Sequence, residues 1–327
     1  MLFVDNAQVT DPRINLAIEE HLLRNVKVAE PILLFYINEP AVIIGRNQNT
    51  LEEIDPDYIE AHGIHVVRRL SGGGAVFHDF GNLNFSFITT GREDLHNFHK
   101  FTQPVVKVLR GMGIDAELRA KSSLFANNKK ISGNAQFLTG DRMFSHGTLL
   151  FDSNIEMLLH ALNPRQVKIE SKAVQSVRSV VMNLREALPP EMDIYAFREA
   201  LLQGVFDGPD IPTYDLTDED WATIRQISAE RYQTWEWNIG RSPKFNVQKT
   251  KRFPVGKVDI RIDVERGRIK GVKVFGDFAG KRLVAELEAL LLGVRYDKDV
   301  LTEALQDYDV SPYFGELETG AFLELLY

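Results

Sequence analysis

The segment 68–87, RRLSGGGAVFHDFGNLNFSF, holds the residue types best suited to binding an anion. Arg68 and Arg69 end an extended stretch, and three glycines follow at 72–74. Consecutive glycines cost backbone entropy, about 0.5–1 kcal/mol each relative to alanine in a regular element. Such a run indicates positive φ angles or the close approach of a ligand to the main chain. Because arginine side chains and bare N–H groups both donate to phosphate or carboxylate, we predict an anion-binding loop. A strained turn with surface arginines is the alternative.

This glycine loop differs from two common nucleotide-binding loops. No Lys-Ser or Lys-Thr follows Gly74, so the sequence lacks the mononucleotide P-loop motif. The three adjacent glycines also lack the G-x-G-x-x-G spacing of a dinucleotide fingerprint. An apolar segment, 75–77, follows directly. We therefore expect the loop to join two strands and to present its amides sideways to a ligand.

A second segment with potential chemistry is KKISGNAQ, residues 129–136. Lys130 comes just before Ser132 and Gly133, whose small side chains leave space beside a projecting ammonium. A partly buried ammonium suits the recognition of an oxyanion. An ordinary solvated hairpin carrying a Lys-Lys pair is the alternative interpretation.

Three further segments carry polar groups at the ends of expected elements: INLAIEE at 14–20, GRNQN at 45–49 and SHGTLLFD at 145–152. Each is weak evidence alone, and a lone histidine is more often structural than a ligand. Together with the glycine loop they predict a deep, partly apolar cavity edged by cations. Such a cavity suits a carboxylic acid with an apolar tail, next to a phosphate.

Composition narrows the class of protein. The 327 residues are 44% hydrophobic and 26% charged, as in ordinary globular proteins, and suffice for two domains. The formal charge of −8 argues against a nucleic-acid-binding surface. No apolar run approaches the about 18 residues of a membrane helix, and no signal peptide is evident. We expect a cytoplasmic protein with neither nucleic acid nor membrane among its partners.

The absence of cysteine excludes a set of mechanisms. With no cysteine in the chain, disulfides, thiolate metal sites and enzyme thioesters cannot form. The eight histidines are scattered, and none has the spacing of an H-E-x-x-H site.

The pattern of apolar residues predicts a mixed sheet with flanking helices, an α+β fold. Residues 31–37 and 41–45, separated by Asn38-Glu39-Pro40, are expected to form a pair of strands with a turn. Capping-box spacing at Thr50 predicts one helix that ends near Gly63. The other expected strands are 64–67, 75–77, 83–88, 114–118, 130–137 and 143–151, and the other expected helices are 15–24, 97–112, 154–162, 193–206 and 218–232.

A domain boundary is expected in the segment 235–246, where Gly240, Ser242 and Pro243 have linker character. This gives a first domain at 1–245 and a small α+β domain at 246–327. The second domain is expected to contain strands at 253–264 and 268–275, a turn at 265–267, and helices at 282–292, 297–306 and 317–326.

These motifs resemble the lipoate–protein ligase A family, within the wider biotin and lipoyl ligase superfamily. The resemblance runs from INLAIEE through RRLSGGGAVFHDFGN and KKISGNAQ to WEWNIGRSPKFN and covers almost the whole chain. It implies a biotin/lipoyl ligase-like catalytic domain with a C-terminal accessory domain. It also implies two steps: ATP and free lipoate give lipoyl-AMP and pyrophosphate, and a lysine of a carrier domain then attacks the adenylate.

Carried over residue by residue, the resemblance assigns Lys130 as the catalytic residue, in contact with both ATP and the lipoate carboxyl. Such a fixed cation would stabilise the charge that develops on the α-phosphate and acyl oxygens. The resemblance implies ATP and Mg²⁺ as cofactors. It assigns the ATP or adenylate site to Arg69, Gly74, Ala75, Val76 and Phe77. It assigns the lipoate site to Glu19, Ser71, Gly72, Gly73 and His146. Further candidates are Arg46, His78 and Asn134, and candidate walls of the acyl tunnel are Val42–Ile44.

Two departures from the family pattern concern the ATP step. Where the family carries G-R-N-D, with an aspartate well placed for Mg²⁺, this chain has Ala-Lys-Ser-Ser, so Ser123 stands at that position. Where the family has S-x-R-S-R-V-x-N, the chain reads SVRSVVMNL, with Val180 in place of the second arginine. Loss of a hard oxygen ligand and of a cation bears on adenylation rather than on lipoate binding.

Three other functions remain as alternatives: a lipoyl or octanoyl transferase, a biotin ligase and a lipoate-binding paralogue with weakened adenylation. The related transferases use a cysteine nucleophile, which this chain lacks. The expected partners are the apo lipoyl domains of 2-oxoacid dehydrogenase E2 subunits, the glycine-cleavage H protein, or both.

Overall fold

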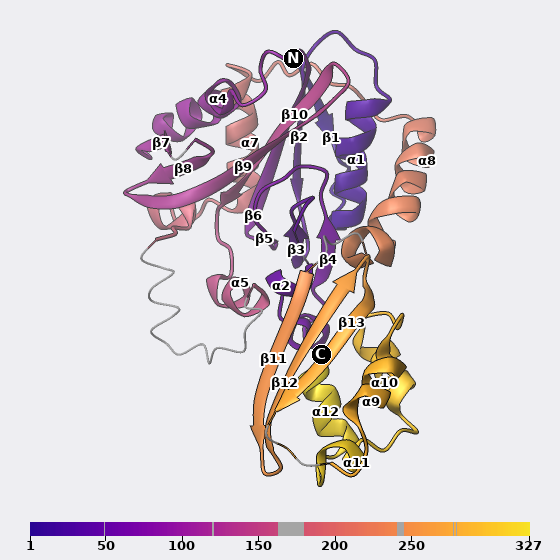
Figure 1. Ribbon diagram of the computed structural model, residues 1–327. Coiled ribbons are helices and arrows are strands. Elements are labelled where there is room, and N and C mark those ends of the chain that lie inside the picture. Colours follow the sequence, from indigo (N-terminus) through magenta and orange to yellow (C-terminus); the bar gives the residue numbers. More distant parts are fainter. Residues whose placement is uncertain (49, 120, 163–179, 241–244, 277, 279) are drawn as a thin grey trace. The chain divides into compact units, whose positions relative to one another are not determined.

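The computed structural model describes residues 1–48, 50–119, 121–162, 180–240, 245–276, 278 and 280–327. The chain forms two compact units, Met1–Thr234 and Trp235–Tyr327 (Figure 1). This division comes earlier in the chain than the boundary that the sequence predicts after residue 245. Residues 241–244 of the segment 235–246, in which the sequence predicts the boundary, lie outside the described residues.

The first unit is built around a seven-stranded sheet with the order β1-β2-β6-β10-β9-β8-β7 (Figure 1). Strand β1 runs parallel to β2, and the other neighbouring strands are antiparallel. In sheet order the strands span Leu2–Asp5, Ile32–Ile37, Asn82–Thr90, Arg142–Leu150, Lys129–Thr139, Ser123–Ala126 and Ala116–Arg119.

Strand β6 shows why the two faces of this sheet differ. Its apolar residues Leu83, Phe85 and Phe87 belong to the main hydrophobic core, together with side chains of the helices α4 (Phe98–Gly111) and α7 (Ile194–Val205). The residues that alternate with them, Asn82, Asn84 and Ser86, are polar and equally buried. Because successive side chains of a strand point to opposite faces, β6 turns a polar face away from α4 and α7.

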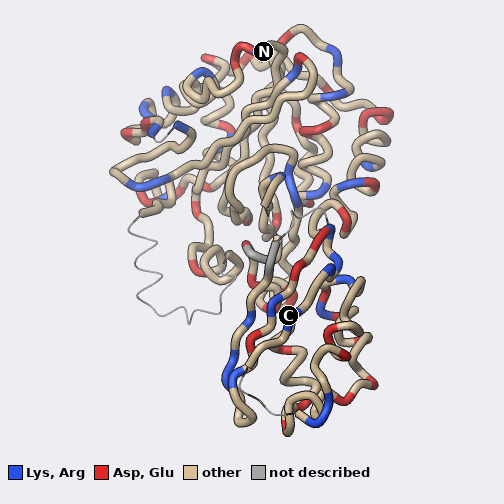
Figure 2. The backbone as a smooth tube through the Cα atoms, viewed as in Figure 1, with Lys and Arg blue, Asp and Glu red and all other residues tan. Residues whose placement is uncertain are grey.

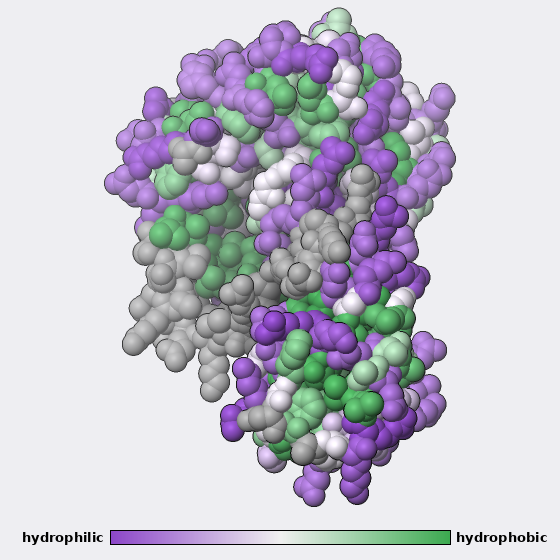
Figure 3. Space-filling view, viewed as in Figure 1, coloured by the Kyte–Doolittle hydropathy of each residue, from purple (hydrophilic) through white to green (hydrophobic). Residues whose placement is uncertain are grey.

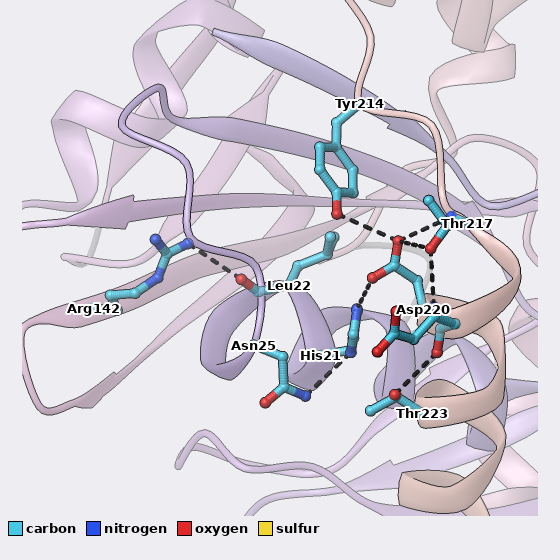
Figure 4. A network of polar contacts seen from close by, with 9 residues as sticks. His21, Leu22, Asn25, Arg142, Tyr214, Thr217, Asp220 and Thr223 are labelled. Carbon is cyan, nitrogen blue, oxygen red and sulfur yellow. Dashed lines mark hydrogen bonds and ion pairs between the residues drawn. The ribbon is translucent and has the colours of Figure 1, made fainter.

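Helix α1 (Pro12–Arg24) packs against helix α8 (Asp218–Ile227) and also contacts β6 and β10. Figure 4 shows the polar network between the two helices. The Asp220 carboxylate accepts a hydrogen bond from His21 Nε2 at 2.8 Å and from the Tyr214 hydroxyl at 3.3 Å. His21 and Asp220 are both largely buried, so this network fixes the outer side of α1.

A second, three-stranded sheet of the first unit carries the glycine loop. Its order is β4-β3-β5, with β3 parallel to β4 and antiparallel to β5. The predicted pairing of residues 31–37 with 41–45 is wrong, because β2 and β3 belong to different sheets. Both strands are buried throughout, so neither has the alternation that would specify a common sheet. The strands β3, β4 and β5 span Ala41–Ile44, His65–Arg68 and Val76–His78.

Two local predictions meet different outcomes. The expected strands 130–137 and 143–151 pair as a hairpin, β9–β10, and Gly140 in its turn has φ +63°. The single helix predicted from Thr50 is instead two short helices, α2 (Thr50–Glu53) and α3 (Pro56–Ala61). In the first turn of a helix, backbone N–H groups have no partner within the helix, so a proline, which lacks an N–H, is tolerated there. Pro56 therefore begins α3, and Asp55 caps the new helix.

The second unit is a three-stranded antiparallel sheet, β11-β12-β13, with helices. Arg266 and Gly267 form the predicted turn between β12 and β13, and both have positive φ, as a two-residue type I′ turn requires. Strand β11 was not predicted, because its residues 248–252 include no apolar residue and so interrupt the alternation. The elements of this unit are β11 (Phe245–Phe253), β12 (Gly256–Glu265), β13 (Arg268–Gly276), α9 (Val284–Leu291), α10 (Lys298–Leu305), α11 (Ser311–Phe314) and α12 (Thr319–Leu326).

Lysine, arginine, aspartate and glutamate are distributed along most elements of both units (Figure 2). Apolar side chains also reach the surface of the second unit (Figure 3), where Phe275, Leu283, Leu290 and Leu292 are 38–73% exposed. Within the described residues, no helix combines the length and the apolar character needed to cross a bilayer.

Candidate active site

The first unit contains a cavity of about 220 Å³ between the glycine loop and the polar face of the large sheet. Its walls come from helix α1, from the loop after β4, from β5, and from strands β2, β3, β6, β8, β9 and β10. The lining residues are Leu16, Tyr36, Ile43, Arg69, Gly73, Gly74, Ala75, Val76, His78, Asn84, Ser122, Ser123, Lys130, Gly133, Asn134, Ala135, His146, Gly147 and Thr148.

A row of residues across four strands forms one side of the cavity. Tyr36 on β2 is the register partner of Asn84 on β6, which is the register partner of Thr148 on β10. The row continues to β9, because the Gly133 N–H donates to Thr148 Oγ1 at 3.2 Å. Three strand spacings of about 4.8 Å give the row a length of about 14 Å. The cavity is thus long enough for a medium-chain acyl group.

Arg69 holds the glycine loop from within. Its guanidinium donates to the carbonyls of Gly72 and Gly74 at 2.7 and 2.8 Å, and to that of Ile43 at 3.0 Å. Burial lowers the pKa of Arg69 to about 10, partly offset by the nearby Tyr36 and Glu19. Arg69 therefore remains a cation near neutral pH, and it lines the cavity while it sets the shape of the loop.

The neighbouring Arg68 has a purely structural set of contacts. Its side chain is fully buried and donates to the carbonyls of Gly45 and Gln48 and to the Thr50 hydroxyl. It does not line the cavity. The two adjacent arginines thus hold two different loops, and of the two only Arg69 can act on a ligand in the cavity.

The three glycines of the loop meet different demands. Gly73 has φ +95°, a conformation that side chains disfavour, so it is required for backbone geometry. A Cβ at Gly72 or Gly74 would meet no atom within 4 Å, and neither has a positive φ. Gly74 lines the cavity, whereas Gly72 does not. Only at Gly74 is the absence of a side chain explained by space for a ligand.

Lys130 marks one end of the cavity. An ideal Cβ on Gly133 would lie 3.6 Å from Lys130 Nζ, so the ammonium extends over that glycine. Among the described residues, the ammonium has no recorded hydrogen bond or ion pair. Burial lowers the pKa of Lys130. A half-buried cation without a protein counter-ion in the described structure is suited to bind an anionic ligand.

A chain of hydrogen bonds supports the wall of the cavity between β10 and the glycine loop. Arg69 Nε donates to Ser71 Oγ at 3.0 Å, and Ser71 Oγ lies 2.8 Å from His146 Nε2. His146 Nδ1 lies 2.9 Å from a carboxylate oxygen of Glu19 on α1. Ser71 thus links Arg69 to His146, and the His146 ring links Ser71 to Glu19. This chain connects α1 to the glycine loop.

The structure gathers most of the candidate residues around this cavity. Nine line it: Arg69, Gly73, Gly74, Ala75, Val76, His78, Lys130, Asn134 and His146. The other five do not line it. Ser71 and Glu19 lie behind the wall, in the hydrogen-bonded chain just described, and the Phe77 side chain packs in a hydrophobic core. Gly72 lies outside the lining, and the Arg46 side chain lies over the Phe137 ring.

Sequence reasoning missed Tyr36, Asn84 and Thr148. A signal for Asn84 is present in the sequence, because Asn82, Asn84 and Ser86 alternate with apolar residues in a strand that is buried on both faces. A buried polar face usually has hydrogen-bond partners or lines a cavity. The signal does not tell which strands carry the neighbouring residues.

The cavity offers few metal ligands. Its described lining contains no aspartate or glutamate, and the described residues contain no group of three or more His, Asp or Glu that could hold a metal ion. Ser123 lines the cavity and is the register partner of Gly133, next to Lys130. Val180 is 56% exposed, and its carbonyl accepts from the Lys130 N–H at 2.8 Å. Residues 163–179, which precede Val180, lie outside the described part of the chain.

Comparison with known proteins places both units. Residues 11–206 match the family model of the lipoyl protein ligase A/B catalytic domain, and residues 242–326 match that of the bacterial lipoate protein ligase C-terminus. The chain is 51% identical over 331 residues to lipoate-protein ligase LplJ of Bacillus subtilis, and the match covers 100% of both chains.

Two solved structures each resemble about three quarters of the chain. One is a bi-partite lipoate protein ligase from Thermoplasma acidophilum, reported with its E2 lipoyl domain, with a TM-score of 0.65 and 30% identity over 75% of this chain and 98% of that one. The other is lipoate-protein ligase A bound with ATP, with a TM-score of 0.61 and 29% identity over 74% of this chain and 98% of that one.

Proposed function

The chain belongs to the lipoate–protein ligase family, and we propose that it activates free lipoate with ATP and transfers the lipoyl group to a lysine of an apo lipoyl domain. The observation that carries this assignment is the cavity, which has the Lys130 ammonium at one end and an acyl-length row of residues leading away from it. The glycine loop supplies the second set of donors along the same space.

In the first step, a carboxylate oxygen of lipoate attacks the α-phosphorus of ATP and pyrophosphate leaves. Lys130 would contact both the carboxylate and the α-phosphate, so one ammonium offsets charge on both reactants. Gly74 allows the phosphate to approach the main chain, since no side chain stands there. A preorganised cation and backbone donors stabilise the transition state without rearranging.

In the second step, the neutral amine of a carrier lysine attacks the acyl carbon of lipoyl-AMP, and AMP leaves. The same Lys130 ammonium would stabilise the oxygen of the tetrahedral intermediate and the departing phosphate. Holding the adenylate in a fixed position lowers the entropic cost of this reaction. The proposed carriers are lipoyl domains of E2 subunits and the glycine-cleavage H protein.

Mg²⁺ is expected to accompany ATP, yet the residues described here do not fit a protein-held magnesium ion. Mg²⁺ in proteins is usually bound by one or two carboxylates, phosphates and water. The described lining of the cavity has no carboxylate, and Ser123 stands where the family pattern has aspartate. We therefore assign the ion to the phosphates and water, and no step above depends on a protein ligand to it.

The function can be tested with the purified chain, an apo lipoyl domain, lipoate and ATP. The expected result is pyrophosphate release together with a mass increase of the carrier by one lipoyl group. Omitting ATP and supplying an octanoylated carrier distinguishes the transferase alternative, which would modify the acceptor under these conditions. Failure to form lipoyl-AMP and to modify any carrier would refute the ligase assignment. A cytoplasmic location stays a prediction that cell fractionation would test.

A further inference from the structure

A chain of buried side-chain amides ends on His78, at the wall of the cavity. Asn6 Nδ2 donates to Asn15 Oδ1 at 2.9 Å, and Asn15 Nδ2 donates to Asn38 Oδ1 at 2.9 Å. Asn38 Nδ2 lies 2.9 Å from His78 Nδ1. All four side chains are at most 4% exposed. The mechanism above uses none of them.

The direction of these hydrogen bonds is fixed by a backbone carbonyl. The Val9 carbonyl can only accept, and both Asn6 Nδ2 and Asn15 Nδ2 donate to it. The orientation of the Asn15 amide requires Asn38 to accept through Oδ1 and hence to donate through Nδ2. His78 Nδ1 must then be the acceptor, so the ring proton is on Nε2.

His78 is thus a neutral imidazole with a fixed tautomer. Burial, with smaller contributions from the charges of Arg69 and His146, lowers the pKa of His78 to about 3. Its Nε2 is buried and has no hydrogen-bond partner among the described residues. A buried N–H without an acceptor is costly, which indicates that a bound ligand supplies one.

The position of His78 in the cavity suggests what that acceptor is. His78 Nδ1 lies 2.9 Å from Asn38 Nδ2, and Asn38 directly follows β2, two residues beyond Tyr36. Tyr36 begins the row of residues that ends at Gly133, over which the Lys130 ammonium extends. His78 therefore lies at the end of the row that is remote from Lys130. An acid whose carboxylate lies at Lys130 would bring the far end of its acyl chain to this place.

We propose that His78 determines the specificity of the acid by donating Nε2–H to a sulfur of a terminal cyclic disulfide, and that Asn38 is the residue that fixes its tautomer. This inference rests on the proposed function and refines it. A saturated alkyl end offers no acceptor, whereas disulfide sulfurs are weak acceptors of hydrogen bonds. The site would thus prefer lipoate over octanoate, an acid with the same carboxylate.

The test compares the adenylation of lipoate and octanoate by wild type, His78→Phe and His78→Gln. His78→Phe keeps a ring but removes the donor, so kcat/KM for lipoate should fall about tenfold while that for octanoate should stay the same or rise. His78→Gln places an amide N–H near the position of Nε2 and should restore part of the preference. His65→Phe, on β4 and outside the cavity lining, is the matched control and should leave the ratio of the two acids unchanged.

Equal losses for both acids in His78→Phe, or an unchanged preference, would overturn the proposal. If the wild type activates neither acid, the proposed function fails instead. A second measurement needs no variant: in wild-type protein with ¹⁵N-labelled histidine rings, His78 should show a protonated Nε2 and a bare Nδ1, and the Nε2–H resonance should shift with lipoate but not with octanoate. A protonated Nδ1, or equal shifts with both acids, would contradict it.

Discussion

Replacing Lys130 by methionine removes the charge and keeps an unbranched side chain of similar length. The ammonium is half-buried at one end of the cavity, and no hydrogen bond or ion pair is recorded for it among the described residues. Its loss therefore breaks no described side-chain contact, and the effect on catalysis reports on the ligand. Loss of one preorganised donor to a developing oxyanion lowers the rate by about 10²–10³-fold.

Both half-reactions should show this loss. Adenylation is followed by pyrophosphate release from ATP and lipoate, and transfer is followed in a single turnover with preformed lipoyl-AMP and an apo carrier. Lys129→Met is the matched control, because Lys129 is adjacent on β9 but does not line the cavity. A surface change of this kind alters free energies by about 0.5 kcal/mol, or about twofold in rate. Near-normal adenylation by Lys130→Met, or an equal loss in Lys129→Met, would refute the role of Lys130.

The same variant makes a prediction for stability. Burial lowers the pKa of Lys130 in the folded protein, so below that pKa the folded state holds a charge whose burial is unfavourable. As pH rises above the lowered pKa, the folded state releases the proton, and the penalty declines until the pH passes the ordinary lysine pKa of 10.5. Lys130→Met should therefore raise the Tm of the ligand-free protein near neutral pH, and its advantage should shrink in the alkaline range. A lower Tm at neutral pH would show that the ammonium stabilises the empty fold.

Three further predictions concern residues around the cavity. Gly74→Ala should fold normally and weaken binding of lipoyl-AMP, measured by calorimetry, whereas Gly72→Ala, equally unhindered but outside the lining, should bind it as wild type does. Ser123→Asp should lower the Mg²⁺ concentration at which adenylation is half-maximal and leave transfer from preformed lipoyl-AMP unchanged; an unchanged Mg²⁺ dependence would count against a carboxylate acting at that position. Arg68→Met leaves buried carbonyl oxygens without a donor, which costs about 1–3 kcal/mol of stability for each, and should lower the Tm by several degrees. Because Arg68 contacts the protein and not the cavity, this loss should appear in the ligand-free protein.

Some of this architecture follows from local sequence. The glycine loop joins strands β4 and β5, as predicted, because three adjacent glycines disfavour regular structure and so separate the two apolar segments into two strands. The β9–β10 hairpin follows from the turn residues Thr139-Gly140-Asp141. Lys130 could be selected because the small residues that follow it leave space around a projecting ammonium. In each case the deciding residues are close together in the chain.

Other features depend on contacts that the sequence does not display. The row Tyr36–Asn84–Thr148 requires the register of three strands that are far apart in the chain. The different roles of Arg68 and Arg69 cannot be seen in two adjacent identical residues. Arg68 faces the loop after β3, and Arg69 faces the glycine loop, because successive side chains of a strand point in opposite directions.

The start of the GRNQN segment, which spans residues 45–49, packs against the glycine loop. This contact explains why residues that do not themselves touch a ligand are part of the family's sequence pattern. A Cβ on Gly45 would lie 2.0 Å from the Gly73 carbonyl oxygen, so the glycine loop packs on a position that admits no side chain. The Arg46 N–H donates to the Ser71 carbonyl at 2.9 Å, and Arg68 donates to the Gly45 carbonyl. Two segments more than twenty residues apart therefore fold as one packed unit. Its shape depends on Gly45 and Arg68, while the amides and the guanidinium that it presents to the cavity come from the glycine loop and Arg69.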